Sequence, residues 1–185
     1  TTAVSSNYNG ADISCNGACD GALTATVSGG NGSITYFWDA TANNQTTSIA
    51  TGLCTGNYSV TISDASNCSV SSSISVSEPS LLVASISSFT SITCNGGNNG
   101  DASLTVAGGT VPYTFLWSDG QTNINATGLI AGVYSVTVND ENSCSLTDVV
   151  TITEPSAVSV GLTGQTNVSC NGGNDGSATV LGSNG

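Results

Sequence analysis

The sequence predicts an all-β fold of short strands joined by tight turns, and three features support this prediction. Val, Ile, Thr and Tyr recur at alternating positions, which is the period of a strand with one buried face. Glycine is frequent, with 23 in 185 residues, and it clusters with Asn, Asp and Ser as in turns. Strong helix formers are scarce, since Lys, Arg and Met are all absent.

The charge composition excludes two classes of partner. The chain has twelve Asp and Glu and no Lys, Arg or His, for a formal net charge of −12. Binding to nucleic acid and to anionic membranes depends on cationic side chains, so neither is expected. No apolar run is long enough for a membrane span, so no membrane insertion is expected. Only 6% of the residues are charged, which favours a folded chain over a disordered one.

The seven cysteines predict disulfides. The chain has no CxxC pair and no His, so zinc sites are disfavoured. Disulfides persist in oxidising compartments, so the cysteines place the protein in an oxidising space. Because the chain starts without Met and stops in the middle of a pattern, we expect it to be a fragment of a longer protein.

An internal repeat of 76 to 79 residues organises the chain. The segment from Cys15 to Trp38 overlays that from Cys94 to Trp117 at an offset of 79, and the later part overlays at 76. A third copy opens at Cys170, again 76 residues after Cys94. The predicted domains are therefore repeat 1 at 1–79, repeat 2 at 80–155 and a truncated repeat 3 at 156–185.

The alternation of apolar and polar residues predicts about seven strands in each full repeat. This count, with inward aromatics on the third strand and a Tyr opening the sixth, is typical of an immunoglobulin-like β-sandwich. Asp148 interrupts the apolar alternation of the last strand, so we expect a bulge or a sheet edge there. The inward positions of repeat 1 are Leu23, Ala25, Val27, Ile34, Tyr36, Trp38, Tyr58, Val60, Ile62, Val70, Ile74 and Val76.

Four motifs together resemble the SprB repeat family. They are C-N-G-G-N-x-G from Cys94, G-G-x-x-P-Y-x-F-x-W at 108–117, G-L-x-x-G-x-Y-x-V-x-V-x-D at 128–140, and T-E-P at 153–155. SprB repeats occur in very large surface adhesins of gliding Bacteroidetes. The resemblance implies an extracellular β-sandwich repeat, exported by type IX secretion and displayed as filaments that attach to surfaces during gliding motility.

Catalysis is not expected, because no His, Lys or Arg is present to activate a nucleophile. No cofactor is predicted. Calcium is the single candidate, because carboxylates without cationic partners offer hard oxygen ligands. The candidate calcium ligands are Asp101, Asp140, Glu141 and Glu154. Their spacing fits no EF-hand, and plain capping of turns is the favoured alternative.

Two functions remain open. The first is a structural stalk of an adhesin or filament, extended because the junction after Glu-Pro is only two or three residues long. The second is a carbohydrate- or ligand-binding module, which usually displays exposed aromatics, whereas Trp38 and Trp117 fall on buried positions. The expected partners are neighbouring repeats of the same chain, with surface polysaccharide and other filament copies as further candidates.

The cysteines allow two pairing schemes. Pairing within repeats joins Cys15 to Cys68 and Cys94 to Cys144. In an immunoglobulin-type topology, however, these loops lie at opposite ends of a module, farther apart than a disulfide spans. Strand direction therefore slightly favours a bond between Cys15 and Cys144, which leaves Cys68, Cys94 and Cys170 to partners elsewhere. Cys19 and Cys54 pair with each other in either scheme.

Overall fold

The computed structural model describes residues 2–183, and the fold of these residues is all-β, as predicted. The described part contains fourteen strands and one short 3-10 helix, η1 (Ala40–Ala42). Contacts divide the chain into two compact units. The first comprises Thr1–Ser85, Val106–Leu116 and Thr137–Thr147, and the second comprises Ile86–Thr105, Trp117–Val136 and Asp148–Gly185. The first unit thus combines repeat 1 with three segments of repeat 2, at 80–85, 106–116 and 137–147.

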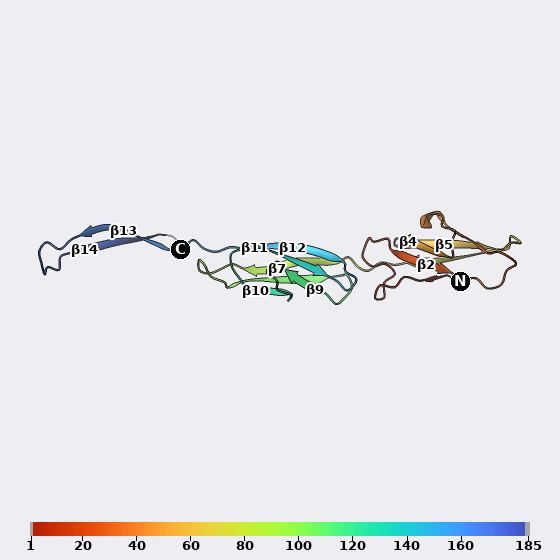
Figure 1. Ribbon diagram of the computed structural model, residues 1–185, viewed down its shortest axis with the longest axis horizontal. Coiled ribbons are helices and arrows are strands. Elements are labelled where there is room, and N and C mark those ends of the chain that lie inside the picture. Colours follow the sequence, from red (N-terminus) through yellow and green to blue (C-terminus); the bar gives the residue numbers. More distant parts are fainter. Residues whose placement is uncertain (1, 184–185) are drawn as a thin grey trace. The chain divides into compact units, whose positions relative to one another are not determined.

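Repeat 1 folds into two sheets around one core (Figure 1). One sheet has the order β1-β2-β4 and the other β3-β5-β6, and neighbouring strands in both sheets run antiparallel. Trp38 is fully buried, and its indole Nε1 donates to the Thr47 carbonyl at 2.9 Å. The strands are β1 (Thr2–Val4), β2 (Gly21–Ala25), β3 (Thr35–Trp38), β4 (Ile49–Leu53), β5 (Gly56–Ser63) and β6 (Ser69–Val76).

Repeat 2 follows the same plan. Its sheets have the orders β10-β8-β7 and β12-β11-β9. Each of the two repeats therefore has six described strands in its two sheets, whereas the sequence predicts about seven. Trp117 is buried like Trp38. Each repeat also has a Tyr hydroxyl that donates to the carbonyl four residues earlier, Tyr58 to Cys54 and Tyr134 to Ile130. The strands are β7 (Val83–Thr90), β8 (Gly100–Ala107), β9 (Thr114–Trp117), β10 (Asn125–Leu129), β11 (Gly132–Asn139) and β12 (Ser145–Ile152).

The start of repeat 3 is a hairpin of β13 (Ser159–Thr166) and β14 (Ser177–Ser183). Every described residue of both strands is exposed. These side chains are exposed because a lone hairpin has no second sheet against which to bury its apolar face.

The structure corrects two of the predicted core positions and accounts for Asp148. Val27 and Val70 are exposed, although they alternate in phase with buried residues. Asp148 lies on the edge strand β12, as expected, and its carboxylate accepts the Ile86 N–H at 2.7 Å. The backbone of β7 therefore satisfies the charge that interrupts the apolar pattern.

Candidate functional site

The candidate site is the junction of two cysteine loops, one from repeat 1 and one from repeat 2, both within the first compact unit. The repeat 1 loop begins at Cys15. The Gly17 N–H donates to the Glu78 carboxylate at 2.7 Å, and the Asn16 amide donates to the Pro79 carbonyl at 3.2 Å. The Glu-Pro pair therefore holds the loop that presents Cys15, a role that the sequence pattern does not reveal.

Asp140 builds the second loop. Its carboxylate accepts three backbone N–H groups, from Thr110 at 2.8 Å and from Asn142 and Cys144 at 2.9 Å each. Asp140 is only 5% exposed. A carboxylate that accepts several N–H bonds is stabilised without a cation, so Asp140, a candidate calcium ligand from the sequence, organises a turn here.

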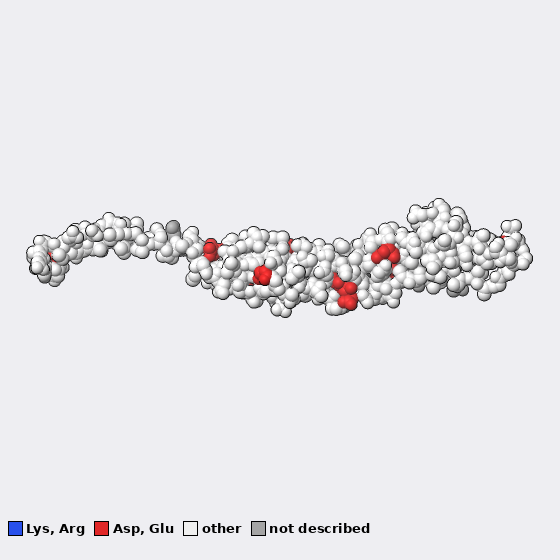
Figure 2. Space-filling model, viewed as in Figure 1, with Lys and Arg blue, Asp and Glu red and all other residues white. Residues whose placement is uncertain are grey.

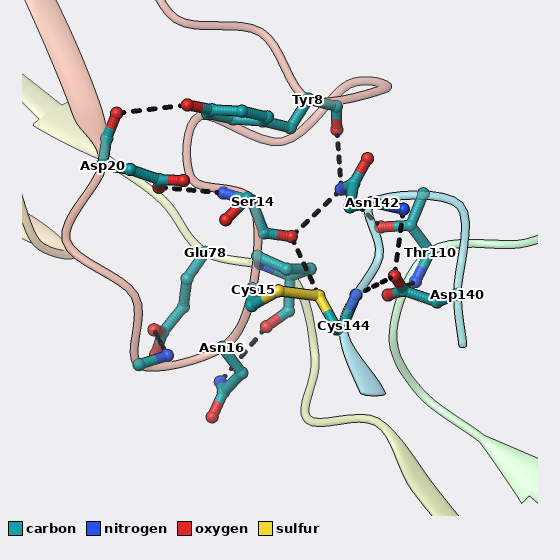
Figure 3. The surroundings of a disulfide bond; sticks show 12 residues. Tyr8, Ser14, Cys15, Asn16, Asp20, Glu78, Thr110, Asp140, Asn142 and Cys144 are labelled. Carbon is teal, nitrogen blue, oxygen red and sulfur yellow. Dashed lines mark hydrogen bonds between the residues drawn. A yellow bond between two sulfur atoms is a disulfide. The ribbon is translucent and has the colours of Figure 1, made fainter. Parts of the chain in front are cut away.

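A disulfide joins the two loops (Figure 3). The sulfurs of Cys15 and Cys144 are 2.03 Å apart and the Cα atoms 5.7 Å apart, across a sequence separation of 129. Of the two pairing schemes that the sequence allows, this bond belongs to the one that strand direction favours, in which Cys15 pairs with Cys144. Cys68, Cys94 and Cys170 are free and exposed, so the structure contains neither of the bonds that pairing within repeats requires.

The side-chain amide of Asn142 forms several hydrogen bonds next to the disulfide. Its Nδ2 lies 3.2 Å from the Tyr8 carbonyl, 3.1 Å from the Ser14 carbonyl and 3.1 Å from the Thr110 hydroxyl. Its Oδ1 accepts from Asn9 at 2.7 Å. Figure 3 shows this amide between Tyr8, Ser14 and Thr110. No sequence signal identified Asn142 as a junction residue, because repeat 1 carries Ser66 at the matching position.

An apolar contact completes the junction. Leu82 is only 8% exposed. Two residues before it, the Ser80 carbonyl accepts the N–H of Gly109 at 2.9 Å. A Cβ at Gly109 would lie 2.7 Å from the Asp140 carboxylate and 3.1 Å from Leu82, and the φ of this residue is +61°. Glycine is thus required there, both for its backbone conformation and for the approach of the linker.

A second disulfide, Cys19–Cys54, lies within repeat 1. The sulfurs are 1.99 Å apart and the sequence separation is 35. Both schemes considered from the sequence include this pair. It adds a local cross-link to the same repeat whose Cys15 reaches repeat 2.

The other calcium candidates either accept hydrogen bonds from the protein or face solvent. Glu154 accepts the Gly96 N–H at 2.6 Å, as Glu78 does in repeat 1, and Asp101 accepts from the Thr90 hydroxyl at 3.4 Å. Glu141 is exposed. Within residues 2–183, no three His, Cys, Asp or Glu side chains are grouped to hold a metal ion. Figure 2 shows the acidic side chains of one face as separate patches on an uncharged surface.

We expect Asn142→Ala to lower the free energy of unfolding by about 1 to 3 kcal/mol, because it leaves partly buried polar groups without partners. Urea unfolding of the oxidised protein measures this change. Ser66→Ala at the matching position of repeat 1 is the control, and we expect it to have a smaller effect. Equal losses for the two variants would contradict a special role for Asn142 at the junction.

We expect the fold to tolerate acid down to about pH 4. The backbone N–H groups of Asn31 and Cys68 hold the pKa of Asp64 below its usual value, and hydrogen bonds from Ser169 do the same for Asp175. Since the folded pKa values are depressed, this stabilisation is present above the unfolded pKa and is lost as the pH falls through the folded one. Circular dichroism across an acid titration measures it. Collapse near pH 5 that calcium reverses would instead reveal a structural metal site.

Comparison with known proteins identifies a repeat family. The model described as SprB repeat matches residues 7–43, 86–122 and 162–185, which together make up more than half of the chain. No curated protein matches the chain. None of the described residues belongs to a helix with the length and apolar character that crossing a membrane requires.

Several solved structures show weaker similarity. A C-terminal 282-residue fragment of intimin, in complex with the intimin-binding domain of its translocated receptor, matches with a TM-score of 0.42 and 13% identity, over 88% of this chain and 66% of that fragment. Dpr2 Ig1-Ig2 in complex with DIP-Theta Ig1-Ig3 matches at 0.34 and 8%, over 88% and 69%. Murine CEACAM1b matches at 0.30 and 10%, over 78% and 94%.

Proposed function

Because this chain belongs to the SprB repeat family, we propose that it is a stalk segment of a secreted cell-surface adhesin or filament. Its immunoglobulin-like modules, at 1–79, 80–155 and from 156 onward, would serve length and display rather than catalysis. Export by type IX secretion and a role in gliding attachment are part of this proposal, since both follow from the family resemblance alone.

The observation that carries the proposal is the covalent link between consecutive repeats. Cys15 and Cys144 are 129 residues apart in sequence and joined by a disulfide. Around them, Asn142 bonds to repeat 1 through Tyr8 and Ser14. A module that only binds a ligand has no need of a covalent link to its neighbour. A stalk that transmits tension benefits from one, because the link holds the junction when noncovalent contacts yield.

The alternative, a carbohydrate-binding module, has less support. Both tryptophans are buried, so neither offers a stacking face to a sugar. Tryptophan fluorescence separates the two functions. A stalk predicts blue-shifted emission that polysaccharides do not change, whereas a change on addition of polysaccharide would favour the binding module.

Pulling a single molecule from its two ends tests the stalk directly. The disulfide shields the residues between Cys15 and Cys144 from extension while it is intact. Reduction should release a segment of roughly 130 residues, which adds about 450 Å of contour length. The Cys15→Ser variant should give the longer extension without reductant. Equal extensions of the oxidised and reduced protein would contradict the stapled stalk.

A further inference from the structure

We propose that the end of repeat 1 around Cys68 is a docking site for the cysteine loop and Glu-Pro linker of another repeat. A second copy of this chain would supply both from around Cys94. This inference rests on the proposed function and extends it, because it gives the segment two complementary ends that join copies in one direction.

The Cys68 loop is built like the loop that holds Cys144. The Asp64 carboxylate accepts N–H groups from Asn31 at 3.0 Å and from Ser66 and Cys68 at 2.9 Å each. These three donors occupy the positions of Thr110, Asn142 and Cys144 around Asp140. Cys144 is bonded to a loop from another repeat, whereas Cys68 is exposed and free.

An apolar pocket lies beside Cys68. Its lining includes Val27, Gly30, Ile34, Ile62 and Val70. Val27 and Val70 are the two positions that the alternation predicts to be buried but that are exposed in the structure. The exposed fraction of Val70 is 56%. Burying such side chains against apolar atoms is favourable, so the face is suited to a partner.

Repeat 2 indicates which partner fits. There Gly109, Cys144 and Leu146 occupy the places of Gly30, Cys68 and Val70, and they line a pocket together with Pro79 and the two leucines that follow Ser80. Leu146 is partly buried at the position where Val70 is exposed. In repeat 2 the Pro-Ser linker and Leu82 thus pack beside Gly109 and form one wall of the pocket. The partner that fits the repeat 1 pocket is therefore a Pro-Ser linker with an apolar residue at the position of Leu82.

The Cys94 end carries the same groups as the Cys15 end. Gly96 N–H donates to Glu154 at 2.6 Å, and the Asn95 amide donates to the Pro155 carbonyl at 3.1 Å. Val158 takes the position of Leu82 and is 76% exposed. Cys94, Pro155 and Val158 also line one pocket, so thiol, linker and apolar side chain are presented together.

The bond that joins two copies is an ordinary thiol–disulfide exchange with glutathione. Glutathione disulfide first forms a mixed disulfide on Cys68 and releases one glutathione thiol. The Cys94 thiolate of the second copy then attacks the Cys68 sulfur, and the second glutathione leaves as a thiol. Two protein thiols are oxidised and one glutathione disulfide is reduced to two thiols.

Two variants of the full chain test the direction of joining. An acceptor variant, with Cys94→Ser and Cys170→Ser, keeps Cys68 as its free cysteine. A donor variant, with Cys68→Ser and Cys170→Ser, keeps Cys94. Both are mixed in a glutathione redox buffer and analysed by intact mass and by peptide mapping without reduction. We expect the Cys68–Cys94 heterodimer to exceed either homodimer by about tenfold, because burial of one Val-sized side chain is worth that much.

A pocket variant provides the matched control. Val70→Asp in the acceptor should lower the heterodimer yield by about tenfold, since it places a charge where Val158 docks. Ile49→Asp, at an exposed apolar position of the same repeat outside the pocket, should leave the yield unchanged. Homodimers in the proportion of random pairing, or equal yields for these two variants, would overturn the inference. Such a result leaves the Cys15–Cys144 link and its pulling test untouched, so the two proposals fail separately.

Discussion

Cys15→Ser is expected to lower the free energy of unfolding by about 3 to 5 kcal/mol, the loss expected when the longer-range of the two disulfides is removed. The disulfide spans 129 residues, and the chain-entropy model assigns greater stabilisation to longer loops. Urea unfolding of the oxidised protein, followed by circular dichroism, measures the difference. In reductant, the wild-type and variant proteins should converge.

Cys68→Ser is the matched control for this experiment. Cys68 occupies the equivalent loop of repeat 1 and has no disulfide partner, so its replacement should change stability by less than about 0.5 kcal/mol. A Cys15→Ser variant as stable as the control would mean that the link does not constrain the unfolded chain. A Cys94–Cys144 linkage in peptide maps would contradict the pairing itself.

Trp38→Ala is expected to cost about 3 to 5 kcal/mol, the range for removing a large aromatic side chain from a packed core. Trp38 is fully buried, and its indole N–H donates to the Thr47 carbonyl, so the variant leaves both a cavity and an unpaired carbonyl. Thermal and urea unfolding measure the loss. Because repeat 1 carries this residue, its strands should unfold first.

The neighbouring Phe37 provides the control for Trp38. It lies on the same strand, β3, but its side chain points to the opposite face and is 53% exposed. Phe37→Ala should therefore cost less than about 1 kcal/mol. If the two substitutions destabilise the protein equally, the assignment of inner and outer faces on β3 is wrong.

The sequence by itself determined the features that depend on local pattern. Alternation with a period of two predicted the all-β fold and the burial of Trp38 and Trp117, because successive side chains of a strand point to opposite faces. Self-comparison predicted the repeat, and the family match recurs at the same offsets. Gly and Asn clusters predicted turns, several of which hold residues at positive φ, among them Gly108 and Gly120.

Only the tertiary structure decided what depends on residues distant in the chain. Periodicity left two cysteine schemes open, because it carries no information on which loops meet across 129 residues. It also missed Asn142 and Glu78, whose partners lie on other loops. Val27 and Val70 follow the same alternation as buried residues, yet they are exposed. A strand pattern specifies which face is apolar, whereas burial also requires something to cover that face, and only packing decides this.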